Sequence, residues 1–321
     1  MYNYEIITSS EEEKSLIKNL HSDLPEHIEM AEYEYNFLTT LIRRKKPKKL
    51  LELGVSQGGS SAILLNAIKD FDDSFLYSID YNTNHYRLKD KKTGFYMNNY
   101  PELKKKWKLS TGGLALNFMD EIGDGIDFCF IDTVHCNPGE ILDFLMVLPY
   151  LKEDATVVFH DTNLQYYALK RRGLLDFQFT NNLLMSAVTG KKLLPFLVND
   201  SGYKFSNIGA IELNSQTMSS CWDIFNLLTI EWVCPPTNDE LSALSLHFKK
   251  FYPQEFCTFF DAAVSEMKGL FHKKVYDDLS KFLDVSDVQE LKLTPSQKLF
   301  STFKINGKRI VVLFGKIFIR I

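Results

Sequence analysis

Between residues 48 and 162, short apolar runs alternate with segments of helical pattern, and this alternation restricts the fold more than any other feature of the chain. The runs typical of strands are KLLELGV, SFLYSID, DFCFIDTVH and ATVVFHDT, and the helical segments SSAILLNAIKDF and GEILDFLMVLPYL lie among them. Strand, helix and strand at this spacing predict a parallel sheet with crossover helices. The strand-like runs are apolar almost throughout, as expected where helices cover both faces of a sheet. We therefore expect an α/β domain in this region.

Two more strand-like runs follow this region. LLPFLV and NIGAIEL are separated by the turn-rich segment VNDSGYKFS, which indicates that the sheet ends near Leu213. We therefore expect one α/β domain over residues 48–214, flanked by segments 1–47 and 215–321. A chain of 321 residues has room for about two domains of ordinary size.

The first 47 residues are expected to be helical. Ser9 and Ser10 can each cap a helix, and Glu12 and Glu13 stand three positions later, which is the spacing of a capping box. Apolar residues then recur every three or four positions over residues 30–42, which predicts a second helix with one buried face.

Residues 215–321 hold many of the 43 aromatic side chains, which make up 13% of the chain. The aromatic helices expected there have three interpretations: a lid over the acceptor, an oligomer interface or ordinary helical core. Asn306-Gly307 between apolar runs predicts a hairpin near the end of the chain. From Gln297 onward the chain carries six basic residues and no acidic one, which favours either contact with an anionic membrane surface or a sheet edge protected by lysines.

Composition excludes several classes of protein. The net charge of −4 gives no bulk positive field, so a nucleic-acid partner is not expected. Five cysteines without a CxxC pair indicate reduced thiols in a cytoplasmic protein. The amino terminus lacks the basic start and apolar run of an export signal, and no apolar stretch is long enough for a spanning helix. We expect a cytoplasmic protein whose basic tail can reach the inner face of the membrane.

A strand that runs into a glycine turn and then a helix marks a cofactor site. The segment LELGVSQGGSS contains Gly54 and Gly58, which let the backbone turn sharply and approach a ligand closely. About 20 residues later the strand FLYSID ends in Asp80, where a carboxylate can accept hydrogen bonds from a ribose. Glu52 beside the turn is a poor neighbour for the pyrophosphate of a dinucleotide and a good one for a cationic amino acid, which favours S-adenosylmethionine.

The order of Glu52, Gly54, Gly58 and Asp80 resembles the class I methyltransferases, which depend on S-adenosylmethionine. The resemblance implies a Rossmann-like, mostly parallel, seven-stranded sheet. It also implies that the methionine part of the cofactor is held by Glu52 and the turn, the ribose by Asp80, and the adenine edge by Thr111 and the glycines that follow. In full, the cofactor-binding residues implied are Glu52, Gly54, Ser56, Gln57, Gly58, Gly59, Ser60, Asp80, Thr111, Gly112 and Asp132. The alternative is that the glycines only shape a turn and Asp80 only caps the next element.

Two later strands end in carboxylates, Asp132 in FIDTVH and Asp161 in FHDTN. If these strands are parallel neighbours about 4.8 Å apart, their carboxylates emerge side by side. Two carboxylates that close repel each other unless a proton or a cation joins them, and oxygen ligands favour Mg²⁺, Ca²⁺ or Mn²⁺. The alternative is that Asp161 caps a turn and His160 is a hydrogen-bonded core histidine.

Residues from about 48 to 214 are similar to one branch of the class I methyltransferases, which includes the macrolide sugar O-methyltransferases and the cephalosporin hydroxylase-like proteins. That branch typically reads FIDGDH, LKPGG and HD, and this chain reads FIDTVH, LKEDA and HD. The resemblance implies that Asp132, His160 and Asp161 bind a divalent metal with Asn163 nearby, and that His135 is the general base beside Asp132. Thr133-Val134 replaces the usual Gly-Asp and so removes one carboxylate.

These observations predict an S-adenosylmethionine-dependent O-methyltransferase that acts on a saccharide or a glycosylated small molecule, with a divalent metal as a second cofactor. The phrases VVLFGKIFIRI and KINGKR resemble the tails of bacterial glycan-assembly enzymes, which favours a sugar acceptor. Two alternatives stay open: a diverged, hydroxylase-like metal-binding relative, and a non-catalytic partner in glycan assembly. A homo-oligomer is a further expectation.

Overall fold

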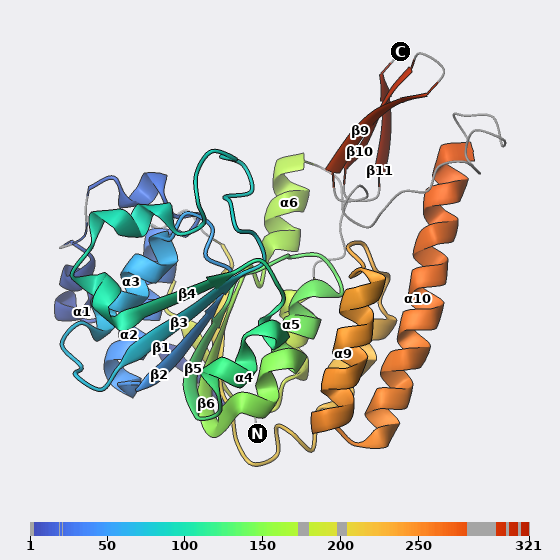
Figure 1. Ribbon diagram of the computed structural model, residues 1–321. Helices are drawn as coiled ribbons and strands as arrows, with labels where there is room; N and C mark the ends of the chain where they lie inside the picture. The colour runs from blue at the N-terminus through green and yellow to red at the C-terminus, as the bar shows by residue number, and fades with distance from the viewer. Residues whose placement is uncertain are drawn as a thin grey trace.

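A computed structural model describes residues 3–18, 20, 22–172, 180–197, 204–280, 300–305, 308–313 and 316–320. Its centre is an eight-stranded sheet in the order β1-β7-β8-β6-β5-β2-β3-β4 (Figure 1). Strands β2 to β6 are parallel, whereas β8 runs antiparallel to both β6 and β7. The strands are β1 (Tyr4–Ile7), β2 (Lys49–Leu53), β3 (Phe75–Asp80), β4 (Trp107–Thr111), β5 (Ile126–Ile131), β6 (Leu151–His160), β7 (Lys191–Pro195) and β8 (Ile208–Glu212).

The predicted α/β fold is confirmed. The order β4-β3-β2-β5-β6 is the Rossmann order, in which the chain first builds the sheet to one side of its first parallel strand and then to the other. The sheet has one strand more than the seven expected, because β1 adds to the edge parallel to β7. Residues 4–7 are therefore a strand and not part of a helix, and this part of the expectation for residues 1–47 was wrong. The segment YEII carries two isoleucines and a tyrosine, which suit a strand.

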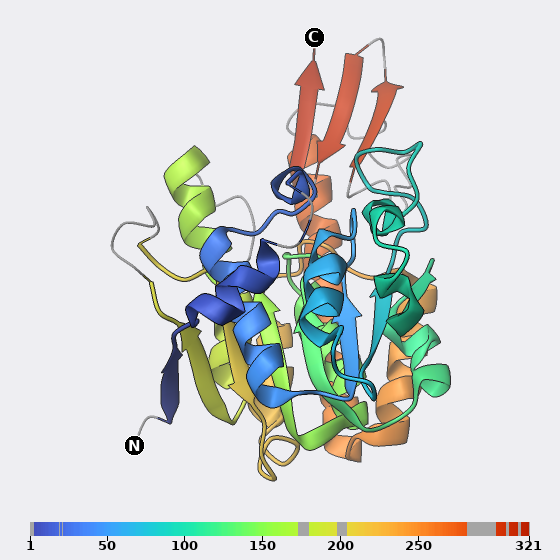
Figure 2. The same ribbon diagram turned by 90° about the vertical axis from the view of Figure 1, so that its left-hand side faces the viewer.

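Helices cover both faces of the sheet, and the strands divide the core between them. On β5, Phe128 and Phe130 belong to one apolar layer and Cys129 and Ile131 to the other, as the two-residue period of a strand requires. The first layer is completed by α2 (Glu32–Lys45) and α3 (Gly59–Ile68), and the second by α5 (Gly139–Val147) with the C-terminal helices. Figure 2 shows the N-terminal helices in front of the sheet and the C-terminal ones behind it.

The expected helices near the amino terminus are present. Helix α1 (Glu11–Ile17) begins with a capping box, in which the Glu13 amide donates to Ser10 Oγ at 3.2 Å and the Ser10 amide donates to Glu13 Oε2 at 2.7 Å. Helix α2 then buries Phe37, Leu38 and Leu41 against the sheet and ends in three basic residues. Both capping and periodicity thus act as the sequence predicts.

The aromatic side chains after residue 215 mostly form core. Helices α8 (Trp222–Asn226), α9 (Asn238–Phe251) and α10 (Gln254–Ser280) continue the apolar layer of α5. Phe225, Trp232, Phe248 and Phe260 are all at most 1% exposed. Of the three interpretations, these residues therefore support ordinary helical core.

A small antiparallel sheet ends the chain. It consists of β9 (Phe300–Ile305), β10 (Lys308–Leu313) and β11 (Lys316–Arg320), in the order β11-β10-β9. Ile305 pairs with Lys308, which is the register that the expected hairpin requires, although Asn306 and Gly307 themselves lie outside the described residues. Among the helices described, none combines the length and the apolar character needed to cross a membrane.

Candidate functional site

The parallel strands place the predicted site residues at one edge of the sheet. The chain leaves β2 toward β3 and β4 and later returns to the other side of β2 to form β5, so the strand order reverses beside β2. Ligands of open α/β sheets bind in the crevice outside the carboxyl ends of the strands at such a point. Glu52, Asp80, Asp132 and Asp161 lie at the carboxyl ends of β2, β3, β5 and β6, and therefore share this edge.

The glycine turn after β2 packs tightly against the protein's own backbone. Gly54 has φ +88°, and a Cβ there would stand 1.8 Å from the carbonyl oxygen of Asp132. A Cβ on Gly59 would stand 2.2 Å from the carbonyl oxygen of His27, and one on Gly58 would stand 3.2 Å from the Cα of Gly94. The packing of the chain therefore requires small residues here, whatever the turn binds.

Asp80 ties this turn to β3. Its Oδ2 accepts hydrogen bonds from the amides of Val55 and Ser56, both at 2.9 Å, and its Oδ1 accepts one from the amide of Asn82 at 2.7 Å. A carboxylate has about four acceptor positions. One position on Oδ1 therefore remains for a ligand hydroxyl.

Glu52 is enclosed by hydroxyl groups and does not face the crevice. Its carboxylate accepts from Ser60 Oγ and Ser61 Oγ at 2.6 Å and from Ser78 Oγ at 2.5 Å, and the residue is fully buried. Burial raises the pKa of Glu52 to about 7, although the three hydroxyls act in the opposite direction. In this arrangement Glu52 and Ser60 join the start of α3 to β3.

Neighbouring segments cover the turn. His27 Nδ1 lies 2.8 Å from Gln57 Oε1, and His85 Nε2 lies 3.1 Å from Ser56 Oγ. The long connection after β3 also donates its Gly94 amide to the carbonyl of Ser56 at 2.9 Å.

The predicted adenine-edge residues lie next to Asp80. Thr111 pairs with Asp80 across β4 and β3, and the Gly112 amide donates to the carbonyl of Asp80 at 3.1 Å. The structure thus brings Thr111 and Gly112 to the same end of the sheet as the predicted ribose ligand.

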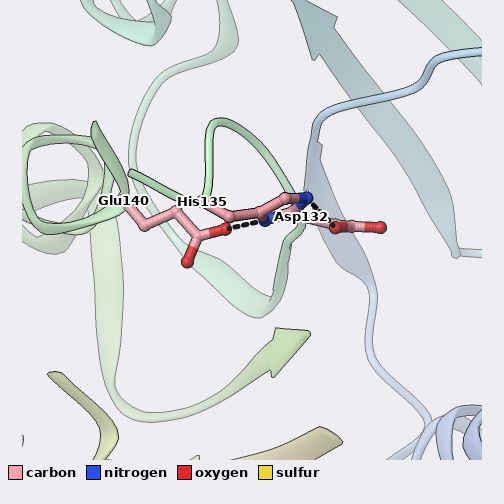
Figure 3. Close-up of side chains that lie close together, drawn as sticks. All are labelled: Asp132, His135 and Glu140. Atoms are coloured by element: carbon pink, nitrogen blue, oxygen red, sulfur yellow. Dashed lines mark hydrogen bonds and ion pairs between the residues drawn. The ribbon is translucent and has the colours of Figure 1, made fainter. Parts of the chain in front are cut away.

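The ends of β5 and β6 bring together a cluster of histidines and carboxylates. His135 lies at its centre: Nδ1 is 3.1 Å from Glu140 Oε1, and Nε2 is 2.9 Å from Asp161 Oδ2 and 3.9 Å from Asp132 Oδ1. Figure 3 shows His135 between Glu140 and Asp132. His135 is thus hydrogen-bonded through one ring nitrogen and faces two strand-end carboxylates through the other.

His160 forms the buried side of the same cluster. Its Nδ1 lies 3.2 Å from Asp132 Oδ1 and 3.6 Å from Asp161 Oδ2, and its Nε2 lies 3.5 Å from Glu34 Oε2 on α2. Asp161 adopts φ +54° and accepts a hydrogen bond from Asn207 Nδ2 at 2.5 Å. The cluster is therefore held from α2, from both strands and from the segment before β8.

The charges of the cluster depend on one another. Burial lowers the pKa of both histidines, but the carboxylates outweigh it and hold both pKa values well above the usual range; Asp161 and Glu140 act on His135, and Asp132 and Asp161 act on His160. Burial raises the pKa of Glu140 to about 7 despite its bond to His135. Burial also acts to raise the pKa of Asp161, but the two imidazoles hold it well below the usual range.

The donor set of this cluster fits a divalent cation. Ligand atoms of the predicted trio Asp132, His160 and Asp161 all lie within 4.8 Å of one another, and so do those of Asp132, His135 and Glu140. Such a cation would replace the imidazole protons as the positive charge among the carboxylates. Asn163 is not one of these donor atoms: its side chain donates to the carbonyl of Ser206 at 2.5 Å, and its amide donates at 3.0 Å to Asn207, which bonds to Asp161.

Sequence reasoning missed Glu34, Glu140 and Asn207. Glu140 is one of two acids in the otherwise apolar helix GEILDFLMV, the other being Asp143, and an acid in such a segment was the one available signal. Glu34 and Asn207 come from α2 and from the segment before β8, far from the strand-end motifs in sequence. No local pattern marks them.

The comparisons with known proteins point to one kind of domain. Residues 51–162 match the family model of the methyltransferase domain. This region, about a third of the chain, runs from β2 past the end of β6 and contains the glycine turn, Asp80 and most of the cluster. A search of curated proteins found no match.

Several solved structures overlap loosely with this one. The O-methyltransferase TomG from Streptomyces achromogenes, involved in tomaymycin synthesis and solved with S-adenosylmethionine, is 18% identical with a TM-score of 0.43, over 65% of this chain and 92% of TomG. An O-methyltransferase from Bacillus cereus, solved with S-adenosylhomocysteine, is 17% identical with a TM-score of 0.42, over 64% and 92% of the two chains. The Podospora anserina methyltransferase PaMTH1, also bound to S-adenosylhomocysteine, is 15% identical with a TM-score of 0.41, over 66% and 99%. These overlaps are too loose to carry an argument about activity.

Proposed function

We propose that this protein is an S-adenosylmethionine-dependent O-methyltransferase whose acceptor is a saccharide or a glycosylated small molecule. One observation carries the proposal: the methyltransferase-domain match coincides with a crevice that has an acceptor position on Asp80 on one side and the cluster around His135 on the other. We also propose that the protein belongs to the branch of class I methyltransferases that includes the macrolide sugar O-methyltransferases. The proposal also includes a divalent cation held by Asp132, His160 and Asp161.

The chain's own groups suit the two parts of the reaction. The free position on Asp80 Oδ1 can accept a ribose hydroxyl, and Thr111 and Gly112, the residues proposed for the adenine edge, lie beside Asp80. When bound, S-adenosylmethionine supplies an electrophilic methyl group, so the protein has to align and deprotonate an acceptor hydroxyl. A hydroxyl held at Asp161 would lie next to His135 Nε2. In its neutral form, which a cation among the carboxylates would restore, His135 would take the proton of that hydroxyl while Glu140 fixes the ring through Nδ1.

A divalent cation would add a second means of deprotonation. A metal ion lowers the pKa of a hydroxyl that it binds, and so helps to expose the nucleophile at the operating pH. It would also remove the need for protons on His135 and His160, because it neutralises the carboxylates that raise their pKa values.

A hydroxylase-like activity is the second candidate, and the two histidines favour it. Two imidazoles and a carboxylate with open positions form the ligand set of non-haem iron oxygenases, and His135 and His160 each lie beside Asp161, at 2.9 Å and 3.6 Å from its Oδ2. The product distinguishes the candidates, because methylation adds the mass of one CH₂ and hydroxylation adds the mass of one oxygen atom. A non-catalytic partner in glycan assembly would give neither product.

Calorimetric titration with S-adenosylhomocysteine tests the cofactor half of the proposal. We expect binding to the purified full chain and at least tenfold weaker binding to Asp80→Asn. The amide nitrogen of Asn replaces one of the two carboxylate oxygens of Asp80, and it cannot accept a hydrogen bond whichever oxygen it replaces. Glu153→Gln, a similar change at an exposed position, serves as the control. No binding by the unmodified protein, or equal binding by Asp80→Asn, would contradict the assignment.

His135→Gln tests the chemical half. Loss of a positioned base is expected to lower the rate of methyl transfer by about 10²–10⁴-fold. Affinity for S-adenosylhomocysteine should stay unchanged, because His135 is not part of the turn that Asp80 holds. Chelation with EDTA followed by addition of Mg²⁺ or Mn²⁺ tests the metal: activity that chelation leaves undiminished would remove it.

Two further proposals concern partners. The basic segment from residue 297 is proposed to contact anionic membranes at the periphery, and the chain is proposed to form homo-oligomers. Sedimentation with anionic liposomes, with and without residues 297–321, tests the first, and light scattering of the full chain tests the second.

A further inference from the structure

We propose that the acceptor binds through an uncharged sugar ring in the cavity beside Asp161, between the start of α6 (Leu164–Arg172) and the start of α7 (Asn181–Ala187). The inference rests on the proposed function, because it names the acceptor subsite of that reaction. The cavity has a volume of about 280 Å³, near the lower end of the range of small-molecule sites. The residues that carry the argument are Asp161, Gln165, Tyr166, Leu169, Asn181 and Asn182.

The cavity adjoins the cluster, because Asp161 belongs to both. Asp161 lines the cavity and also places its Oδ2 2.9 Å from His135 Nε2. A hydroxyl of a ring in the cavity that donates to Asp161 would therefore be adjacent to the proposed base. This proximity makes the cavity the natural subsite for the group that is methylated.

Carboxamides dominate the polar lining. Gln165, Asn181 and Asn182 each offer two donor hydrogens and an acceptor oxygen, which match the mixed donor and acceptor character of sugar hydroxyls. Asn181 is 2% exposed; its Nδ2 donates to the carbonyl of His160 at 2.9 Å, and its Oδ1 is buried without a hydrogen-bond partner. That oxygen has less than 1 Å² of accessible surface, so the carboxamides that can meet a ring directly are those of the exposed Gln165 and Asn182.

An apolar side completes the cavity. Tyr166 is held in edge-to-face contact with Phe205 at a centroid distance of 4.8 Å, and Leu169 is 45% exposed. A sugar ring presents C–H groups on one face and hydroxyls around its rim, so it can pack on Tyr166 and Leu169 while its rim meets the carboxamides.

Charge argues against an anionic acceptor. Among the described residues that line the cavity none is basic, and Asp161 is the one acidic group. Even with the cation proposed at Asp161, a phosphate or carboxylate on the acceptor would have no basic side chain of the lining to pair with, so its charge would be desolvated at a cost. A wholly apolar or phenolic acceptor would in turn leave the carboxamides without partners. A neutral, hydroxyl-rich ring satisfies both conditions.

The test uses the full chain with Mg²⁺ and the variants Gln165→Ala and Asn182→Ala. Both residues are exposed, so the fold should tolerate the changes, and Gln254→Ala at the exposed start of α10 is the matched control. The probes are a panel of methyl hexopyranosides, the corresponding hexose 6-phosphates and catechol. Binding is followed by saturation-transfer NMR, and turnover by release of S-adenosylhomocysteine.

We expect a neutral methyl hexopyranoside to bind in preference to its 6-phosphate and to catechol. Each cavity variant should raise its KM or Kd about tenfold, with kcat and affinity for S-adenosylhomocysteine kept. Tighter binding of the phosphates or catechol, binding of no saccharide in the panel, or unchanged saccharide affinity in both variants would overturn the inference. Failure of the proposed function looks different: saccharides would bind in a variant-sensitive way while S-adenosylhomocysteine does not bind at all.

Discussion

Two halves of the same strand-end crevice use carboxylates in opposite ways. In the turn half, at the ends of β2 and β3, Glu52 and Asp80 accept hydrogen bonds from neutral hydroxyls and backbone amides. In the cluster half, at the ends of β5 and β6, Asp132 and Asp161 face imidazoles and each other. Neutral donors fix geometry and have no proton to exchange near neutral pH. An imidazole can release its proton and then accept one from a substrate, or it can bind a metal ion instead.

The pKa shifts follow the same division. Burial without a nearby cation raises the pKa of Glu52 to about 7, so whether Glu52 is charged depends on the exact pH near neutrality. Asp161 is also buried, but its two histidine neighbours hold its pKa well below the usual range. Under the proposed function, the turn half holds the cofactor in a fixed geometry and the cluster half carries the chemistry.

The largest expected effect comes from Gly54→Ala, which acts where the two halves touch. The new Cβ would stand 1.8 Å from the carbonyl oxygen of Asp132, and the position has φ +88°. Left-handed backbone costs about 1–2 kcal/mol for a residue with a Cβ, and the overlap adds about 1–3 kcal/mol as β2 and β5 separate. Urea unfolding should show a loss of about 2–5 kcal/mol, and the folded fraction should have a disturbed cluster around Asp132.

Gly125→Ala is the matched control for this prediction. Gly125 also has a positive φ, +84°, but a Cβ there would meet nothing within 4 Å. Its loss should be limited to the backbone cost of about 1–2 kcal/mol. An equal loss of unfolding free energy in the two variants would contradict the close approach of Gly54 to the carbonyl oxygen of Asp132. The turn half and the cluster half would then not be in contact at this point.

The second prediction tests the charge of Glu52 in the turn half. Its folded pKa of about 7 exceeds the reference value of 4.5, so between these pH values the folded state keeps a proton that the unfolded state releases. The free energy of unfolding therefore falls as pH rises through this window, by up to about 3 kcal/mol from this group. Glu52→Gln removes the dependence.

Urea unfolding at pH 5 and pH 7.5 measures this effect. Relative to the unmodified protein, Glu52→Gln should become more stable by about 2 kcal/mol as pH rises. The same change at the exposed Glu153 should produce no such trend. A Glu52→Gln variant that tracks the unmodified protein at both pH values would show that Glu52 is ionised when folded, and would make the two halves more alike than the structure indicates.

The sequence predicts where the site residues lie in the sheet better than it predicts their contacts. The strand-like runs and the order of Gly54, Asp80, Asp132 and Asp161 suffice to place these residues at one sheet edge, because parallel strands with right-handed crossovers have few alternatives. The direction in which Glu52 points could not be read, because it depends on Ser60 and Ser78, which meet it only in the folded sheet.

The cluster was predicted in part, for a related reason. Asp132 and Asp161 were expected together from strand ends, and His160 was added by the resemblance to a known family. Glu34 and Glu140 reach them from helices whose rotation about their axes is set by tertiary packing, and an acid within such a helix does not reveal its partner. The strand β1 was missed because four residues without a turn signal carry little periodicity.

The smallest expected effect separates a positioning role from a structural one in the cluster half. Glu140 Oε1 lies 3.1 Å from His135 Nδ1 and is fully buried, so it fixes the ring whose Nε2 faces Asp161. Glu140→Ala should lower kcat about tenfold, about 1.4 kcal/mol in the activation free energy, with KM and affinity for S-adenosylhomocysteine kept. Glu140→Gln should retain most of the rate, since its amide oxygen can accept the same hydrogen bond from Nδ1. If Glu140 were scaffold like Glu52, both substitutions would shift the free energy of unfolding and leave kcat unchanged, and the division between the two halves would fail at this residue.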